Sequence, residues 1–191
     1  MVLFLKPTEV SVNKLALAAV LLAAPLAARA EVGLRLGLDA SVAYHDQQNG
    51  GSTHFITDNF PLGADVMLSY WTPGSLLAID LELGEAFYLS PPGAFSSRIG
   101  TILRPGVRLS PPILPVYLRA AIPISLEAPA EYDAGRTYGL RLGAGITIPL
   151  VLFKVYVEGD IDTPLGGGKT GAPKAFDTWN LVLNGGLDFR F

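Results

Sequence analysis

From residue 31 to its C-terminus, the chain alternates apolar and polar residues with a period of two. Successive side chains of a β-strand point to opposite faces of a sheet, so this alternation predicts strands. In the clearest segment, Leu140 and Leu142 flank Arg141, and the alternation continues to Ile148. No helical period of 3.6 residues extends over a comparable length. Eight segments are predicted as strands, at 32–44, 61–71, 76–88, 98–109, 114–125, 137–148, 152–162 and 178–191.

The connections between these segments are alternately long and short. The long ones, at 45–60, 89–97, 126–136 and 163–177, are rich in Gly, Pro and polar residues. The short ones lie at 72–75, 110–113 and 149–151. Outer-membrane barrels have an even number of strands, with short turns at the periplasmic end and longer external loops. The pattern therefore predicts an all-β fold, an eight-stranded antiparallel up-and-down transmembrane β-barrel formed by residues 31–191.

The charged residues of the segments occupy the positions between the aliphatic ones. If the aliphatic set faces lipid, the charged set fills the lumen, which in an eight-stranded barrel is only wide enough for side chains. The reverse arrangement, a soluble barrel with an aliphatic core, fits the alternation equally well. The predicted lumen set of seven acids and six arginines is Arg35, Asp39, Asp65, Asp80, Glu82, Arg104, Arg108, Arg119, Arg141, Glu158, Asp160, Asp188 and Arg190.

Aromatic residues gather near the two ends of the predicted strands, which favours the membrane arrangement because aromatic belts mark membrane interfaces. Prolines inside or near the fourth and fifth segments lack the backbone donor of a sheet, so we expect bulges or irregular pairing there. Those prolines are Pro105, Pro115 and Pro123. The aromatic residues are Tyr44, Phe87, Tyr88, Tyr138 and Trp179 at the presumed outer ends of the strands, where the long connections lie, and Tyr70, Trp71, Phe153, Phe189 and Phe191 at the presumed inner ends.

The first 30 residues have the organisation of a secretory signal peptide. Lys6 and Lys14 precede an apolar stretch at 15–26 that is too short to span a bilayer. Ala28 and Ala30 are the small residues that signal peptidase reads, so we expect cleavage before Glu31. An uncleaved N-terminal anchor is the alternative.

The chain ends in an alternating segment that closes on Phe189 and Phe191. With the signal peptide and the eight segments, this ending resembles the small Gram-negative outer-membrane β-barrel proteins, the group that includes the membrane domain of OmpA and OmpX. The resemblance covers residues 31–191. It implies an outer-membrane location and identifies Phe189 and Phe191 as the signal read by the barrel-assembly machinery. In contrast to OmpA, we expect no second, peptidoglycan-binding domain after the barrel, and therefore no tether to the cell wall.

Residues suited to catalysis or metal binding are few. The chain has no Cys, and its two His, His45 and His54, share one polar connection with the possible partners Asp46, Ser52, Thr53 and Asp58. The segment 166–170 (GGGKT) lacks the spacing of a phosphate loop. The acidic residues Glu127, Glu131 and Asp133 allow cation-bridged contact with lipopolysaccharide. We interpret the histidine connection, the segment 166–170 and the acidic cluster as solvated loops. We therefore predict no enzyme activity, no cofactor and no metal site.

The expected function is therefore structural or surface interaction by a monomeric barrel with four external loops. Its expected partners are outer-membrane lipid, lipopolysaccharide and the assembly machinery. The net charge of −3 offers no basic surface for nucleic acid. Three alternatives remain open: a narrow passive pore or small-solute transporter, an outer-membrane lipid-modifying enzyme, and a soluble periplasmic lipid-binding barrel.

Overall fold

The computed structural model describes residues 31–47, 50–56, 60–72, 74, 76–130, 137–167 and 176–191. Among these residues, no helix is long and apolar enough to cross a membrane. Several predictions concern residues outside this set. These are the export signal at 1–30 with Ala28 and Ala30, the segment 168–170, Asp58, Glu131 and Asp133.

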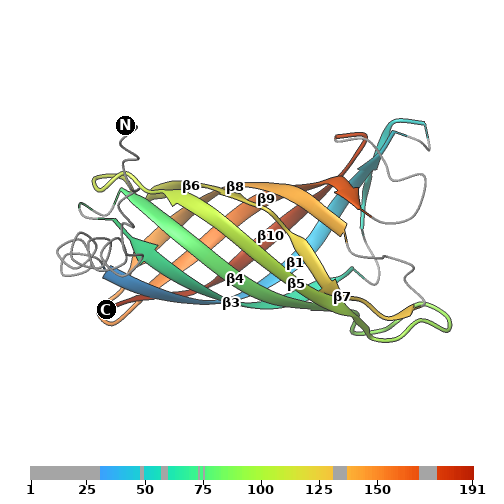
Figure 1. The fold of residues 1–191 in the computed structure, drawn as a ribbon, viewed down its shortest axis with the longest axis horizontal. Helices are drawn as coiled ribbons and strands as arrows, with labels where there is room; N and C mark the ends of the chain where they lie inside the picture. The colour runs from blue at the N-terminus through green and yellow to red at the C-terminus, as the bar shows by residue number, and fades with distance from the viewer. Residues whose placement is uncertain are drawn as a thin grey trace, which may run out of the picture. The chain divides into compact units, whose positions relative to one another are not determined.

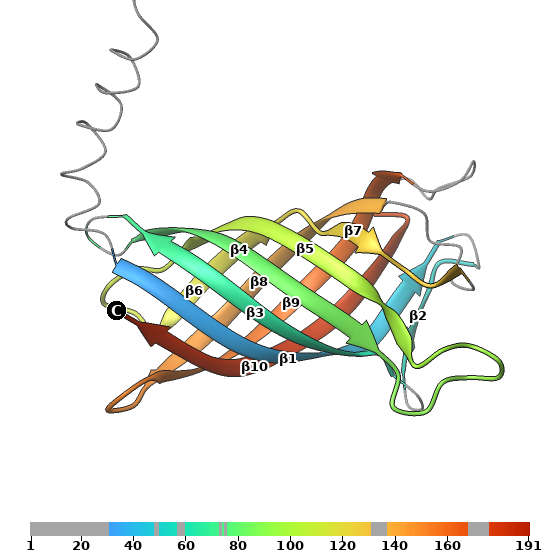
Figure 2. The same ribbon diagram turned by 60° about the horizontal axis from the view of Figure 1, so that its bottom comes forward.

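The described residues form one antiparallel sheet that closes on itself (Figures 1 and 2). Its strands are β1 (Glu31–Asp46), β2 (Ser52–Phe55), β3 (Leu62–Trp71), β4 (Leu77–Phe87), β5 (Arg98–Leu109), β6 (Val116–Ala121), β7 (Ile124–Glu127), β8 (Thr137–Pro149), β9 (Lys154–Gly167) and β10 (Thr178–Arg190). The order of neighbours is β10-β9-β8-β6-β5-β4-β3-β1, and pairing of β10 with β1 closes the barrel. Figure 2 shows β1 and β10 side by side.

The predicted eight-stranded antiparallel barrel is confirmed, with two differences in its strands. The predicted strand at 114–125 is divided into β6 and β7, which follow one another between β5 and β8. The predicted loop at 45–60 contains β2, which pairs with the end of β1 as a hairpin outside the barrel order. In Figure 1 the connection 88–97 and hairpin strand β2 lie at the right end of the barrel and the C-terminus at the left. We call these the loop end and the turn end.

The break between β6 and β7 has a physical cause in two prolines. Pro105 and Pro123 lack the N–H that would continue the hydrogen-bond ladder. Their carbonyls still accept, since the Ile122 amide donates to Pro105 at 2.9 Å and the Gly139 amide donates to Pro123 at 2.9 Å. The expected irregularity therefore occurs between the fourth and fifth barrel strands.

The two faces of the barrel wall have opposite character. Outward aliphatic side chains are exposed, such as Leu68 (56 %), Ile79 (57 %) and Leu118 (59 %). The inward face is charged and buried. One expectation is wrong: Trp71 does not belong to a lipid-facing aromatic belt at the short-turn end, because its side chain is 1 % exposed. Its position has the same parity as Asp65 and Ser69 on β3, so it points into the lumen.

Candidate functional site: the ion-paired lumen

Alternation along the strands places the charged side chains inside the barrel. The thirteen residues of the predicted lumen set all lie on barrel strands, and eleven of them are buried. The two others lie nearer water, with Asp39 and Arg190 side chains 11 % and 21 % exposed. Three arginines stand directly opposite an acidic residue of the neighbouring strand. These pairs are Arg35–Asp188, Arg104–Glu82 and Arg141–Asp162.

Glu82 on β4 lies at the centre of the loop-side half of the network. Its carboxylate pairs with Arg104 of β5 and with Arg119 of β6, and Arg141 of β8 lies 4.0 Å away. Asp39 of β1 bridges two of these arginines, at 3.7 Å from Arg104 and 3.9 Å from Arg141. Four neighbouring strands of the barrel, β4, β5, β6 and β8, are therefore joined through one carboxylate that is 0 % exposed.

Arg141 also anchors the network to β9. Its guanidinium donates through Nε and Nη2 to the two oxygens of Asp162, at 2.6 and 2.5 Å. This two-pronged geometry is the strongest arrangement for an arginine and a carboxylate. Asp160, two residues earlier on the same strand, lies 3.8 Å from Arg141. Asp162 was not among the predicted lumen residues, although its parity on β9 matches that of Asp160.

A second group of charges fills the half nearer the turn end. Arg35 pairs with Asp188 at 3.0 Å and with Glu158 at 3.4 Å. Arg108 pairs with Asp80 at 3.1 Å and lies 3.6 Å from Asp188.

Shared carboxylates connect the two halves into one continuous network. Glu158 also lies 3.4 Å from Arg119, and Asp80 lies 3.7 Å from it. Each of these two acids thus contacts Arg119 and one arginine of the turn-side group.

Aromatic rings complete the turn-side half. The Arg35 guanidinium lies 4.6 Å from the ring centre of Tyr117 and 4.3 Å from that of Tyr156. Arg108 and Arg190 lie 4.8 and 3.8 Å from the ring centre of Trp71. Such cation–π contacts strengthen when water is excluded. The sequence prediction missed Tyr117 and Tyr156, although their parity matches that of Arg119 and Glu158.

Glycines make space for these large side chains. A Cβ atom at Gly145 would collide with the Tyr117 ring, and one at Gly143 would collide with Asp160. A Cβ at Gly159, by contrast, would have only Leu183 as a neighbour, at 4.0 Å. The inward glycines of β8 are therefore part of the packing of the lumen.

Asp65 differs from the rest of the predicted set. It lies in the lumen, but no arginine of the described residues comes within ion-pair distance of it. Its closest polar partner is the amide nitrogen of Asn184, at 3.4 Å, and Asn184 in turn accepts from the Tyr156 hydroxyl at 3.0 Å.

The charged side chains fill the middle of the lumen. The Glu82, Arg108 and Asp160 side chains in mid-lumen are 0 % exposed, and each lies within ion-pair distance of an opposite charge. Buried charges are stable only when paired and hydrogen-bonded. The network therefore acts as a plug that crosslinks the strands through their side chains.

The histidines of the first long connection lie in the hairpin of β1 and β2. His45 hydrogen-bonds Thr53 at 3.1 Å and stacks on Trp179, with ring centres 5.4 Å apart. Ser52 contacts the other imidazole, with Oγ 2.6 Å from Nε2 of His54. The two histidines thus have separate partners. Within the described residues, no group of three or more His, Cys, Asp or Glu side chains is arranged to hold a metal ion.

Glu127, from the predicted acidic cluster, belongs to a charged group at the loop end. Arg98 donates to Glu127 at 3.0 Å, to Thr101 at 2.8 Å and also to Glu85. Thr101 in turn donates to Glu85 at 2.6 Å. This group joins β4, β5 and β7 at the rim of the barrel.

Comparison of the chain with family models, curated proteins and solved structures finds no match. Inferences about function therefore rest on the geometry of the barrel.

Proposed function

We propose that this chain is an outer-membrane β-barrel protein of structural or surface-interaction type. The lumen is polar and ion-paired, and four external loops at the loop end face the surroundings of the cell. The observation that carries the proposal is the inverted distribution of the two barrel faces. Leu118 is 59 % exposed on the wall while its neighbour Arg119 is buried inside.

Physical chemistry favours lipid as the surrounding of such a barrel. In water, each exposed aliphatic side chain would lose the stabilisation that burial gives, about 25 cal/mol per Å² of apolar surface. The charged side chains would also pay the desolvation cost of burial although water was available outside the barrel. In a bilayer, exposed Leu and Ile are already in an apolar solvent. An Arg turned outward would instead cost about 2–4 kcal/mol near the midplane. The register that buries Arg104 and Arg119 together is therefore the favoured one in lipid.

The C-terminal strand supports assembly in that membrane. Phe191 is 77 % exposed, and its backbone pairs with Val32 across the closing seam, with N–O distances of 2.9 and 3.3 Å. A terminal aromatic that is exposed beside the closing strands can be recognised before closure and can anchor at the interface afterwards. We propose the barrel-assembly machinery, outer-membrane lipid and lipopolysaccharide as partners of a monomeric barrel.

The closed lumen favours a structural or interaction role over transport. A passive pore needs a hydrated path, and the mid-lumen charges are inaccessible to water. A soluble lipid-binding barrel would need an apolar interior, which this lumen lacks.

Cell fractionation of the expressed full chain tests the location. We expect it in the outer membrane, folded, with a gel mobility that changes on boiling. Planar-bilayer recording of the same protein then tests the role, and we expect no steady conductance. Recovery of the folded protein from the periplasm without detergent would contradict the membrane proposal. A stable open channel would contradict the closed lumen and favour the pore.

A further inference from the structure

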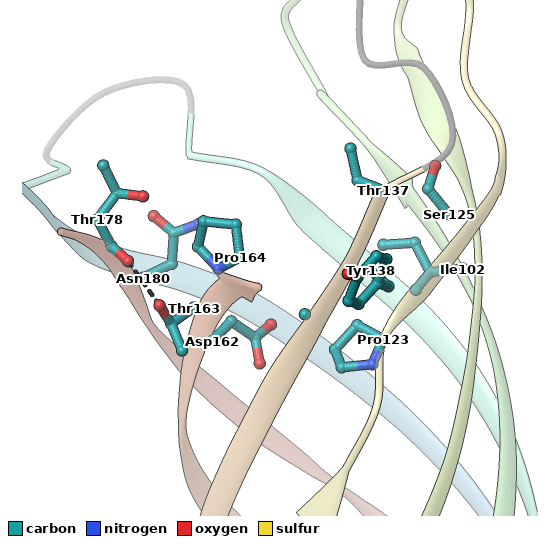
Figure 3. A pocket seen from close by; sticks show the side chains of 11 residues that line it. Ile102, Pro123, Ser125, Thr137, Tyr138, Asp162, Thr163, Pro164, Thr178 and Asn180 are labelled. Carbon is teal, nitrogen blue, oxygen red and sulfur yellow. Dashed lines mark hydrogen bonds between the residues drawn. The ribbon is translucent and has the colours of Figure 1, made fainter. Parts of the chain in front are cut away.

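A cavity of about 300 Å³ lies at the loop end of the lumen, beside the ion-paired plug. Strands β5, β8, β9 and β10 contribute to its lining, together with β7 and Pro123. Figure 3 shows these side chains around the opening. A volume of this size is at the lower limit of ligand sites in proteins, which suits a ligand about as large as one sugar unit.

One wall of the cavity is apolar and carries ring surfaces. It is formed by Ile102, Pro123 and the ring of Tyr138, which lie together in Figure 3, while Pro164 lies on the other side beside Asn180 and Thr163. Such a surface packs against the C–H groups of a ligand without needing hydrogen bonds.

Polar side chains line the cavity on both of its sides. Ser125, Thr137 and Asn180 line the cavity, and none of the three forms a side-chain hydrogen bond to another described residue. Thr163 is different, because its hydroxyl already donates to the Thr178 carbonyl at 3.0 Å and accepts from the Phe176 amide at 2.9 Å. Among the described residues, these three side chains therefore have no competing hydrogen-bond partner.

Asp162 determines which charge the ligand can have. Its carboxylate lines the cavity, but both oxygens already accept from Arg141. The negative charge is therefore neutralised, while each oxygen keeps further acceptor capacity. A neutral hydroxyl donor fits this carboxylate better than a cation does.

The short strand β7 forms the barrel wall beside the cavity. It pairs with β8 at Ile124 and Tyr138. On its other side β7 is fixed to β5, where Glu127 pairs with Arg98.

We propose that this cavity binds a neutral polyhydroxylated ligand, a sugar unit, whose hydroxyls bind Asn180, Thr137 and Asp162 while its C–H face packs on Pro123 and Tyr138. The sugar is either free in solution or the headgroup of a glycolipid in the surrounding leaflet. The inference gives a ligand class to the surface-interaction role proposed above and rests on it.

Titration of the full chain in nanodiscs of zwitterionic lipid, followed by backbone amide NMR shifts, tests the proposal. The probes are methyl β-glucoside and octyl β-glucoside, which carry the same headgroup. We expect saturable shifts at residues 137–139 and 178–180. Saturation by both probes assigns the site to a free sugar, and saturation by the alkyl glucoside alone assigns it to a glycolipid headgroup.

Two variants remove the hydrogen-bonding groups without touching the plug. Asn180→Leu and Thr137→Val should each weaken binding by about two- to tenfold. Ser90→Ala, an exposed position in the 88–97 connection, is the matched control and should bind as the unmodified chain does. A gel shift on boiling confirms that each variant is folded.

Three results would overturn the proposal. They are the absence of saturable shifts with either probe, equal affinity in Asn180→Leu and the control, and binding of protonated glucosamine more than tenfold tighter than methyl glucoside. Each of these leaves the fractionation and conductance results unaffected. A failure of sugar binding is therefore distinguishable from a failure of the membrane proposal.

Discussion

Glu82 is the residue at which removal of one charge should have the largest effect on the barrel. It is 0 % exposed and contacts Arg104 and Arg119, with Arg141 at 4.0 Å. In Glu82→Ala these three guanidinium groups lose their shared partner in a space that water does not reach. Removing one member of a buried ion pair costs about 3–5 kcal/mol.

The contacts that the three arginines keep in Glu82→Ala determine where in that range the loss of stability should lie. Arg119 keeps Glu158 at 3.4 Å, and Arg141 keeps Asp162 at 2.5 Å. Arg104 keeps only Asp39, at 3.7 Å. Because each arginine retains some compensation, we expect about 3 kcal/mol, equivalent to a change of about 10²-fold in the unfolding equilibrium.

Urea unfolding of the full chain in lipid vesicles, followed by tryptophan fluorescence, measures this change. Leu142→Val is the control, since Leu142 lies outside on β8, is 47 % exposed, and should change stability by less than about 1 kcal/mol. Glu82→Gln keeps the shape and loses the charge, so it should fall between the two. If Glu82→Ala unfolds within 1 kcal/mol of the unmodified chain, the network does not crosslink the strands and our reasoning is wrong.

Further predictions concern single positions. Deleting Phe191 should lower the yield of heat-modifiable barrel in cells, and an undiminished yield would contradict its role in assembly. Gly145→Ala should destabilise the barrel by about 1–3 kcal/mol because its Cβ meets Tyr117, whereas Gly159→Ala should be tolerated; equal unfolding midpoints would exclude the packing argument. Leu142→Arg should cost about 2–4 kcal/mol in vesicles, and a neutral effect would argue against a lipid-facing wall.

The sequence predicts the barrel well because two independent patterns agree. The alternation of apolar and polar residues predicts which residues share a face. The alternately long and short connections predict that consecutive strands are antiparallel neighbours. Arg104 and Glu82 could be placed on the same face by parity, although their direct opposition depends on the register of β4 and β5. That register follows from where the turn begins and ends, which the sequence defines only within a few residues.

Other features depend on information that parity alone does not carry. Trp71 was assigned to an aromatic belt by its place near a strand end, but its parity turns it inward, where Arg108 and Arg190 lie over its ring. Asp65 shares the parity of the lumen set, yet no described arginine pairs with it, and its direct cross-strand partners are Gly37 and Gly84, which have no side chain. The break after β6 was expected from Pro123 and Pro105, whereas hairpin β2 lacked a clear alternating signal.

The most direct test of the central claim is where the aliphatic face of the wall lies. The chain has no Cys, so a single cysteine placed at Leu142 or at Leu68 can carry an environment-sensitive fluorophore in the folded full chain. In vesicles that contain lipids brominated on their acyl chains, our account predicts blue-shifted emission and strong quenching at both positions. Emission typical of water, unaffected by the brominated lipids, would contradict the proposal that this barrel spans a membrane.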